Sequence, residues 1–250
     1  MSPLVHEPAD AEVARPDPGQ WPTVSVIVPA YNAEAYVREA VESTVAQTVA
    51  PIEVLVVNDG STDGTGAVVD EVAREHAVVR VIHQENGGPA VARNTAIAVA
   101  KGEFLAFLDA DDAMAPDRLE FQIGYLLAHP GTDVVIGAVE RSTETGVELP
   151  TEFLKHEMIA QEYAEGINLM AMTARASAFA SLGMFDPSYR LSEDYQWLVR
   201  AHRRDVTIAL VPRVVGRRRL HETNVSSAVD DVRNQMFRVL REHIREQRGS

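Results

Sequence analysis

The chain has 250 residues, which suits one larger α/β domain or two small ones, and 46% of them are hydrophobic, enough to bury a sizeable core. Its formal net charge of -14 argues against nucleic acid or an anionic membrane as the main partner. The absence of cysteine excludes disulfides and thiolate metal sites and fits the reducing cytoplasm, where we expect the protein. No apolar run approaches the roughly 20 residues of a transmembrane segment.

The first part of the chain has the composition of an unstructured segment. Residues 1–21 lack the basic start and apolar centre of a signal peptide. They are rich in proline and acidic residues, which is typical of disorder. We therefore expect a disordered leader over 1–21 and a folded part that starts at about Pro22.

Short apolar strands alternate with helical segments through the first half. The expected strands are 24–28, 52–57, 78–82 and 104–108, and the expected helices are 34–47, 65–76 and 90–100. The first strand is expected to stop at Pro29, because proline cannot donate to a central ladder. This alternation predicts an α/β fold with a mostly parallel sheet that helices cover on both faces.

The second half is less regular. The expected helices are 118–127, 177–182 and 192–203, with another somewhere in 153–163, and the expected extended segments are 133–139, 167–173, 206–211 and 214–219. Residues 229–250 carry apolar side chains at helical spacing and predict an amphipathic C-terminal helix. Its apolar stripe fits packing within the chain or a homodimer contact.

Polar clusters follow three of the expected strands, at 29–32, 58–63 and 109–112. Ligands of open parallel sheets bind beyond the carboxyl ends of the strands. The three clusters are therefore expected to converge on one site.

The third cluster is strongly acidic, with Asp109, Asp111 and Asp112 close to Asp117. Crowded carboxylates repel one another unless a cation or a sugar hydroxyl lies between them. Such oxygen ligands suit Mg2+ or Mn2+ with a phosphate as a further ligand. The alternative is that Asp111 or Asp112 caps the helix that Pro116 helps to start. Capping explains one carboxylate only, so we favour the metal.

Four blocks of sequence follow one another in a specific order and spacing: VSVIVPAYN at 24–32, VVNDGSTD at 56–63, NGGPAVARN at 86–94 and FLDADD at 107–112. Glu193-Asp194 and His221 add two short, late matches. Together they resemble glycosyltransferase family 2 over about residues 23 to 226. The resemblance implies the GT-A fold, a Rossmann-like, mostly parallel sheet flanked by helices. It implies one domain over 22–228, with a donor half at about 22–115 and a smaller acceptor half at about 116–228.

The resemblance also implies the residues that hold the donor. Asp59 would read the base edge, Asp109 would bond the ribose, and Arg93 would meet a phosphate or the base. Tyr31 would stack on the base or ribose beside Pro29. The alternatives are a turn aspartate at 59, a buried aromatic at 31 and a surface ion pair at 93.

A metal–diphosphate site is implied as well. Asp111 resembles the ligand of Mn2+ or Mg2+ between the two phosphates, and His221 would complete this site. One arginine of the run 217–219, for which we take Arg219, would clamp the leaving diphosphate with its planar fork. Asp112 would support the metal or the donor sugar, or cap a helix.

The segment Ser192-Glu193-Asp194 has two interpretations. Ser192 is a good N-cap, and acids in the first turn of a helix interact favourably with its dipole. The resemblance implies instead that Asp194 deprotonates the acceptor hydroxyl, which is a poor nucleophile until a base takes its proton. We take Asp194 as the catalytic base and Glu193 as its substitute.

The expected function is therefore the inverting, metal-dependent transfer of one sugar from a nucleotide diphospho-sugar, with UDP favoured over GDP or dTDP. The acceptor hydroxyl could belong to a polysaccharide, a lipid-linked glycan, a natural product or a protein. Processive synthases of the family carry a Gln-x-x-Arg-Trp motif, and Gln196-Trp197 lacks that spacing.

Three other functions remain as alternatives. A sugar nucleotidyltransferase would carry a glycine-rich loop after the first strand, and residues 29–33 contain no glycine. A dinucleotide-binding oxidoreductase would carry Gly-x-Gly-x-x-Gly at the same place. A non-catalytic nucleotide-sugar-binding module would bind the donor without turnover, and Asp194 argues against it.

Overall fold

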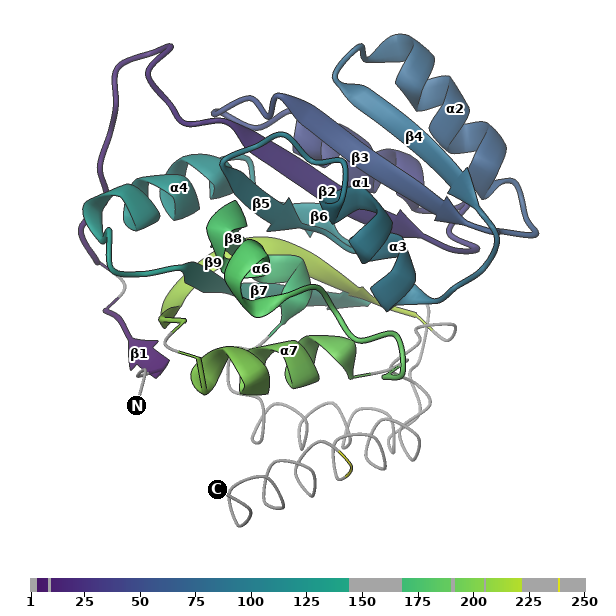
Figure 1. Ribbon diagram of the computed structural model, residues 1–250. Coiled ribbons are helices and arrows are strands. Elements are labelled where there is room, and N and C mark those ends of the chain that lie inside the picture. Colours follow the sequence, from purple (N-terminus) through teal and green to yellow (C-terminus); the bar gives the residue numbers. More distant parts are fainter. Residues whose placement is uncertain are drawn as a thin grey trace.

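The computed structural model describes residues 4–8, 10–143, 168–189, 192–204, 206–221 and 238. These residues form one mixed sheet with helices on both faces (Figure 1). The strands are β1 (Leu4–His6), β2 (Val24–Ala30), β3 (Glu53–Asp59), β4 (Val79–Gln84), β5 (Phe104–Phe107), β6 (Ala113–Met114), β7 (Val134–Thr143), β8 (Met172–Arg175) and β9 (Ile208–Leu220). The helices are α1 (Val37–Val45), α2 (Thr65–Glu75), α3 (Pro89–Ile97), α4 (Arg118–Ala128), the 3-10 turn η1 (Leu169–Ala171), α6 (Ala176–Leu182) and α7 (Glu193–His202).

The strand order is β1-β9-β7-β8-β5-β2-β3-β4, and β6 pairs with β9 outside this path. Strands β5, β2, β3 and β4 are parallel, whereas β8 runs antiparallel to both β5 and β7. Right-handed crossovers place α1 and α2 on one face and α3 on the other, because α3 returns the chain from β4 to β5. The expected α/β architecture with a mostly parallel sheet is confirmed. Its strand order reverses between β2 and β5, which is where such sheets bind ligands.

Strand β2 does not stop at Pro29 as expected. Pro29 lies inside β2 and stands opposite Val57 of β3. Successive residues of a strand turn their peptide groups to opposite neighbours, and Ile27 accepts from the Leu108 N–H on the β5 side. The nitrogen of Pro29 therefore faces the β5 side just beyond the last bond of that ladder. No ladder bond is lost, so the strand continues.

The expectation of a disordered leader is wrong for the part that the structure describes. Leu4–His6 forms β1, which runs parallel to β9 at the edge of the sheet. Farther along, the Ala14 N–H donates to the Gly124 carbonyl of α4 at 2.9 Å, and Val13 packs against the core. A Cβ at position 124 would lie 2.5 Å from the Ala14 carbonyl oxygen, so glycine allows this close approach. The average composition of the leader did not predict this, because only a few backbone hydrogen bonds and contacts hold the segment against the domain.

Two further boundaries differ from expectation. Strand β8 begins at Met172 because residues 169–171 form the 3-10 turn η1. Residues 208–220 form one strand, since β9 absorbs its central irregularity in register shifts opposite Gly137–Val139 of β7. The helix expected in 153–163 lies outside the described residues, and so does the C-terminal helix apart from Arg238. The homodimer contact through that helix stays a prediction.

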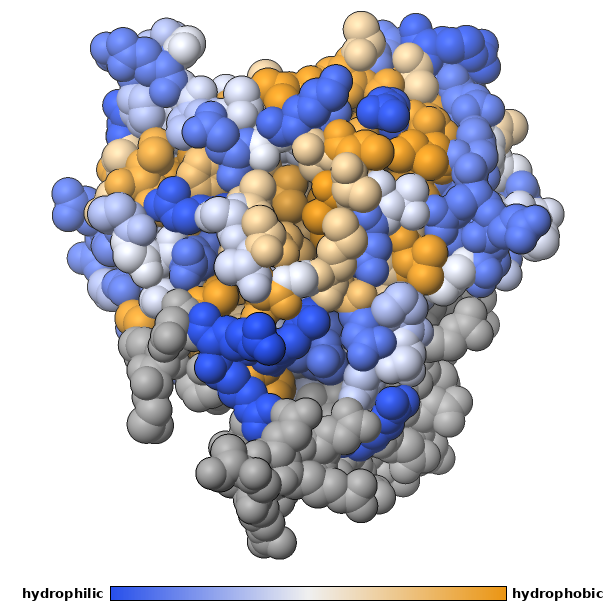
Figure 2. Space-filling view, in the orientation of Figure 1, coloured by the Kyte–Doolittle hydropathy of each residue, from blue (hydrophilic) through white to orange (hydrophobic). Residues whose placement is uncertain are grey.

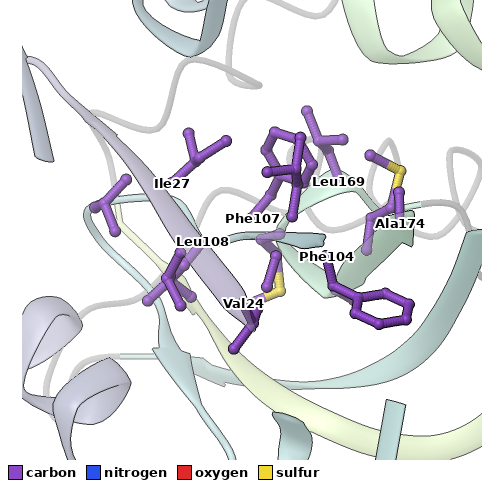
Figure 3. Close-up of a cluster of buried hydrophobic side chains, with 14 of the residues drawn as sticks. Val24, Ile27, Phe104, Phe107, Leu108, Leu169 and Ala174 are labelled. Atoms are coloured by element: carbon purple, nitrogen blue, oxygen red, sulfur yellow. The ribbon is translucent and has the colours of Figure 1, made fainter. Parts of the chain in front are cut away.

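The two parts of the sheet share one core. Figure 3 shows Val24 and Ile27 of β2 together with Phe104 and Phe107 of β5, and with Leu169 and Ala174 on the acceptor side. All six are at most 3% exposed. Burial of each large apolar side chain contributes about 1.5–3 kcal/mol. This packing holds the end of β5, and with it the acidic cluster that follows.

Aromatic side chains fasten α7 to the acceptor side. Trp197 of α7 stacks on Phe179 of α6 at 4.6 Å between ring centroids, and its indole N–H donates to the Gly183 carbonyl at 2.8 Å. Figure 2 shows hydrophobic side chains at the centre of this face, over α6, and a band of strongly hydrophilic ones over α7. The apolar side of α7 is thus turned inward.

No helix among the described residues is long and apolar enough to cross a membrane.

A buried arginine anchors η1 and β8. Arg118, at the start of α4, is fully buried and donates to the carbonyls of Met170 and Met172 and to the side chain of Gln122. Burial lowers its pKa to about 9. Three hydrogen bonds to oxygen acceptors offset part of the cost of placing this cation in the core.

Candidate active site

The polar clusters after β2 and β3 interlock at the reversal of strand order. The Asn32 side chain accepts from the Thr62 N–H at 2.8 Å, and the Ala33 N–H donates to Thr65 Oγ1 at 2.8 Å. Asn32 adopts a positive φ of 48°, which asparagine tolerates better than most residues. The two loops therefore form one rigid edge, as their positions after neighbouring strands predicted.

Asp59 occupies the N-terminus of α3. One carboxylate oxygen accepts from the Gly87 N–H at 2.9 Å and from the Gln84 amide at 2.6 Å, and the other accepts from the Gly88 N–H at 2.8 Å. Gly88 has a φ of +88°, which favours glycine. The positive end of a helix is a good place for an anion. Gly87 and Gly88 thus bind the protein's own carboxylate, and Asp59 is only 3% exposed.

Tyr31 lies just beyond β2 and is 51% exposed. The alternative of an ordinary buried aromatic at this position is therefore wrong. Pro29, two residues earlier, is only partly buried. A ring and a proline at the end of β2 offer flat apolar surface for a base or ribose, although this role stays a prediction.

Arg93 of α3 joins two carboxylates from distant parts of the chain. It donates to Asp109 at 2.7 Å and to Glu193, and its side chain is only 7% exposed. Burial lowers the pKa of Arg93, but the charges of Asp109, Glu193 and Asp194 outweigh it and raise that pKa. The alternative of a surface ion pair at Arg93 is therefore wrong, because the ion pair is buried. Asp109 keeps 36% of its side chain exposed and so stays open toward a ligand.

The acidic pair opens helix α7. Ser192 stands at the N-cap position, but its side chain makes no capping bond and its buried Oγ has no partner among the described residues. Burial, opposed by Arg93, raises the pKa of Glu193 to about 7 and also raises the pKa of Asp194. Asp194 is partly exposed and accepts from the Tyr195 N–H at 2.7 Å. Ser192 therefore does not cap α7 through its side chain, although Glu193 and Asp194 do lie in the first turn of the helix, as the structural alternative expects. Raised pKa values at a buried pair are also typical of functional sites.

Pairing of β6 with β9 brings the acidic cluster to the basic segment. Asp111 lies 3.0 Å from the Nε2 of His221, and Asp112 accepts from the Arg219 backbone N–H at 2.8 Å. The N-cap of α4 is Asp117, which pairs with Arg213. The alternative that Asp111 or Asp112 caps this helix is therefore wrong.

The donor set fits a divalent cation. Burial and the charges of Asp111 and Asp109 raise the pKa of Asp112 to about 9, so added positive charge would relieve this crowding. A carboxylate on Asp111 and an imidazole on His221 are ligand types that Mn2+ accepts. Among the described residues no group of three or more His, Asp or Glu side chains is placed so that it could hold a metal ion. Two protein ligands would leave the remaining positions to a donor and water, which is the usual situation for a metal that binds phosphate.

Two site residues on α1 and its N-cap escaped the sequence analysis. Glu39 receives bonds from both Arg217 and Arg219, and Tyr36 stacks on His221 at 4.7 Å between ring centroids. The Arg219 guanidinium also lies 5.0 Å from the ring centroid of Tyr36. The only available signal was that α1 follows β2, whose end borders the site. Arg219 thus lies beside the acidic cluster, and Arg217 donates to the same carboxylate, Glu39.

A family model described as glycosyl transferase family 2 matches residues 25–181. An uncharacterized glycosyltransferase of Rickettsia felis is 33% identical over 186 residues, which make up 70% of this chain and 30% of that protein. The uncharacterized glycosyltransferase EpsJ of Bacillus subtilis is 46% identical over 36% of this chain and 26% of its own length. The chain therefore spans less than a third of either relative.

Solved structures share the fold. S. aureus TarS 1-349 in complex with UDP-GlcNAc is 25% identical, with a TM-score of 0.68 over 87% of this chain and 65% of that one. Mannosyltransferase PcManGT from Pyrobaculum calidifontis, in complex with GDP-Man and Mn2+, is 22% identical, with a TM-score of 0.73 over 94% and 68%. The family match covers more than half of the chain and agrees with the site at the reversal of strand order, so the chain belongs to glycosyltransferase family 2.

Proposed function

We propose that the protein transfers one sugar from a nucleotide diphospho-sugar to an acceptor hydroxyl, with inversion and with the help of Mn2+ or Mg2+. One observation carries the proposal. The partly exposed carboxylates of Asp109 and Asp111 lie just after the end of β5, and Arg93 joins Asp109 to the acidic pair at the start of α7. Groups for holding a diphosphate and a group for taking a proton thus lie on one side of the sheet.

The donor nucleoside would lie along the ends of β2, β3 and β5. Asp59 is held rigidly by three bonds and keeps acceptor capacity for a base N–H. Tyr31 would stack on the base or ribose, with Pro29 beside it, and Asp109 would accept from ribose hydroxyls. We favour UDP over GDP or dTDP, supported by the UDP-GlcNAc complex of TarS.

Asp111 and His221 would hold the divalent cation, which when bound neutralises charge that develops on the departing diphosphate. Arg219 lies on the same wall, where its planar fork suits phosphate oxygens. In the described structure this arginine donates to Glu39. Its engagement with a diphosphate therefore requires exchange of one carboxylate partner for the ligand.

Asp194 would take the proton of the acceptor hydroxyl while its oxygen attacks the anomeric carbon. The bond from that carbon to the phosphate oxygen breaks in the same displacement, so configuration inverts. Its raised pKa brings Asp194 closer to the range in which a general base is effective. Glu193 is engaged by Arg93, which leaves Asp194 as the less encumbered carboxylate.

The cytoplasmic location of the protein stays a prediction.

A screen of nucleotide sugars tests the proposal. The full chain with Mn2+ is heated with each of several UDP-, GDP- and dTDP-sugars, and donor hydrolysis is measured in parallel. We expect one nucleotide to raise the melting temperature and to be slowly hydrolysed, with less of both in EDTA. Stabilisation without turnover in the presence of any hydroxyl acceptor would favour a non-catalytic binding module. Failure of every nucleotide sugar to stabilise the protein would overturn the proposal.

A further inference from the structure

We propose that Arg93 is a positioning residue, which holds the acidic pair Glu193-Asp194 at a set distance from the donor site by bridging Asp109 and Glu193. The inference rests on the proposed function. It gives Arg93 a role other than the contact with a phosphate or base that the family resemblance implies.

The geometry of the bridge is specific. The two terminal nitrogens of one guanidinium bond to two carboxylates, Asp109 at the end of β5 and Glu193 in the first turn of α7. Glu193 and Arg93 are separated by 100 residues along the chain, and their side chains are 6% and 7% exposed. A planar fork fixes both distance and direction between its partners. Arg93 therefore sets where α7 begins relative to the donor carboxylate.

The next residue of α3, Asn94, binds the segment between α6 and α7. Asn94 donates to the Phe185 carbonyl at 2.8 Å and accepts from the Phe185 N–H at 3.0 Å. Phe185 lies between α6 and α7, and it contacts Trp197 of α7 with 6.0 Å between ring centroids. The start of α3 is itself held by Asp59 through Gly87 and Gly88. One helix thus connects the donor edge to the helix that carries Asp194.

Stability alone is a weak reason for this arrangement. A buried ion pair often contributes no more than well-packed apolar side chains of the same volume. Its value lies in a fixed geometry, since a misplacement of about 1 Å can cost on the order of 10²-fold in rate. Asp194 follows Glu193 directly, so a shift of Glu193 moves the proposed base.

The test compares Arg93→Met, Arg93→Lys, Glu193→Gln and the double variant Arg93→Met/Glu193→Gln with the wild type. Arg38→Met is the matched control, because Arg38 also pairs with carboxylates but lies at the surface. Melting temperature, affinity for the nucleoside diphosphate with Mn2+, and kcat and KM for the donor are measured on each. Arg93→Lys keeps a buried cation and serves if Arg93→Met fails to fold.

We expect Arg93→Met to lower kcat by about 10²-fold, with donor affinity changed by less than a factor of about three. It should also melt lower, because Glu193 is left buried without its cation. The double variant removes that charge, so its melting temperature should recover while kcat stays low. Arg93→Lys should retain stability but lose part of kcat, since one ammonium does not reproduce the fork.

Any of three outcomes would overturn the inference. Recovery of kcat together with melting temperature in the double variant would show a purely structural role. Loss of nucleoside diphosphate affinity in proportion to turnover would show that Arg93 contacts the donor. Wild-type turnover is the separate test of the proposed function: an inactive wild type defeats that function, whereas an active wild type with equally active Arg93 variants defeats only this inference.

Discussion

The donor half and the acceptor half of this molecule assemble their site residues in different ways. In the donor half the contacts join neighbouring parallel strands and short separations: Asn32 to Thr62 spans 30 residues, and Gly88 to Asp59 spans 29. The acceptor half contributes its residues over long separations, with Glu193 bonded to Arg93 across 100 residues and His221 near Asp111 across 110. The residues proposed to bind the donor thus belong to one parallel layer, whereas the positions of the proposed base and metal ligand depend on how α7 and β9 dock on it.

Replacement of the proposed base, Asp194, should have the largest effect of the changes considered. Asp194→Asn keeps size and the acceptor for the Tyr195 N–H, so folding and donor binding should survive. Transfer should fall by about 10²–10⁴-fold, the usual contribution of a positioned base. Melting temperature, donor affinity and transfer rate on a single preparation check this.

Asp117→Asn is the matched control, because that carboxylate pairs with Arg213 at the surface. Unchanged transfer by Asp194→Asn would return Asp194 to a capping role. The search for the base would then move to Glu193.

The junction at Asp111 and His221 should control the response to metal. Mn2+ should strengthen binding of the nucleoside diphosphate, and Asp111→Ala should remove that enhancement. Loss of a residue that only supports a metal ligand typically costs about 10–100-fold, so loss of the ligand itself should cost at least as much. Titration calorimetry with Mn2+ and with EDTA measures it. Asp117→Ala, a nearby acid outside the cluster, should keep the enhancement. Equal affinity of the wild type in Mn2+ and in EDTA would defeat the prediction.

Burial of Glu193 between the halves should make stability depend on pH. Its pKa rises from 4.5 to about 7 on folding, so between these values the folded protein binds more protons than the unfolded chain. This contribution to stability is fully present below about pH 4.5, declines as pH rises to about 7, and is absent above. Glu193→Gln stays neutral, so its melting temperature should gain on the wild type across that interval. Parallel melting curves from acid to alkaline pH would contradict the assignment.

The smallest effect should come from the leader, whose described backbone bonds reach β9 and α4 in the acceptor half. A chain that starts at Trp21 loses the pairing of β1 with β9 and the contact of Ala14 with Gly124. For a chain of this size each kcal/mol lost lowers the melting temperature by about 2–4 °C. Donor binding should be unaffected.

Gly124→Ala should produce a similar loss, because a Cβ there would lie 2.5 Å from the Ala14 carbonyl. Gly131→Ala, where a Cβ meets nothing within 4 Å, is the matched control. An unchanged melting temperature in both the shortened chain and Gly124→Ala would mean that the leader is dispensable.

Local pattern was sufficient for most of the donor half. Helix α2 runs over Thr65–Glu75 against an expected 65–76, and β4 over Val79–Gln84 against an expected 78–82. The polar clusters at 29–32, 58–63 and 109–112 lie at the ends of β2, β3 and β5 as predicted, because buried strands and amphipathic helices carry their own periodicity. The sequence by itself therefore determined the fold class, the parallel layer and the edge at which the donor residues lie.

Only the tertiary structure decided how groups distant in sequence share partners. Pro29 stays in β2 because its nitrogen faces the end of β5, and Gly87-Gly88 hold Asp59 because α3 starts there. Glu39 joins the site through two arginines of β9, nearly 180 residues away. Periodicity records which face of an element is buried, but the partner of a buried or clustered charge depends on docking. The bridge from Asp109 through Arg93 to Glu193 is for this reason a property of the folded chain.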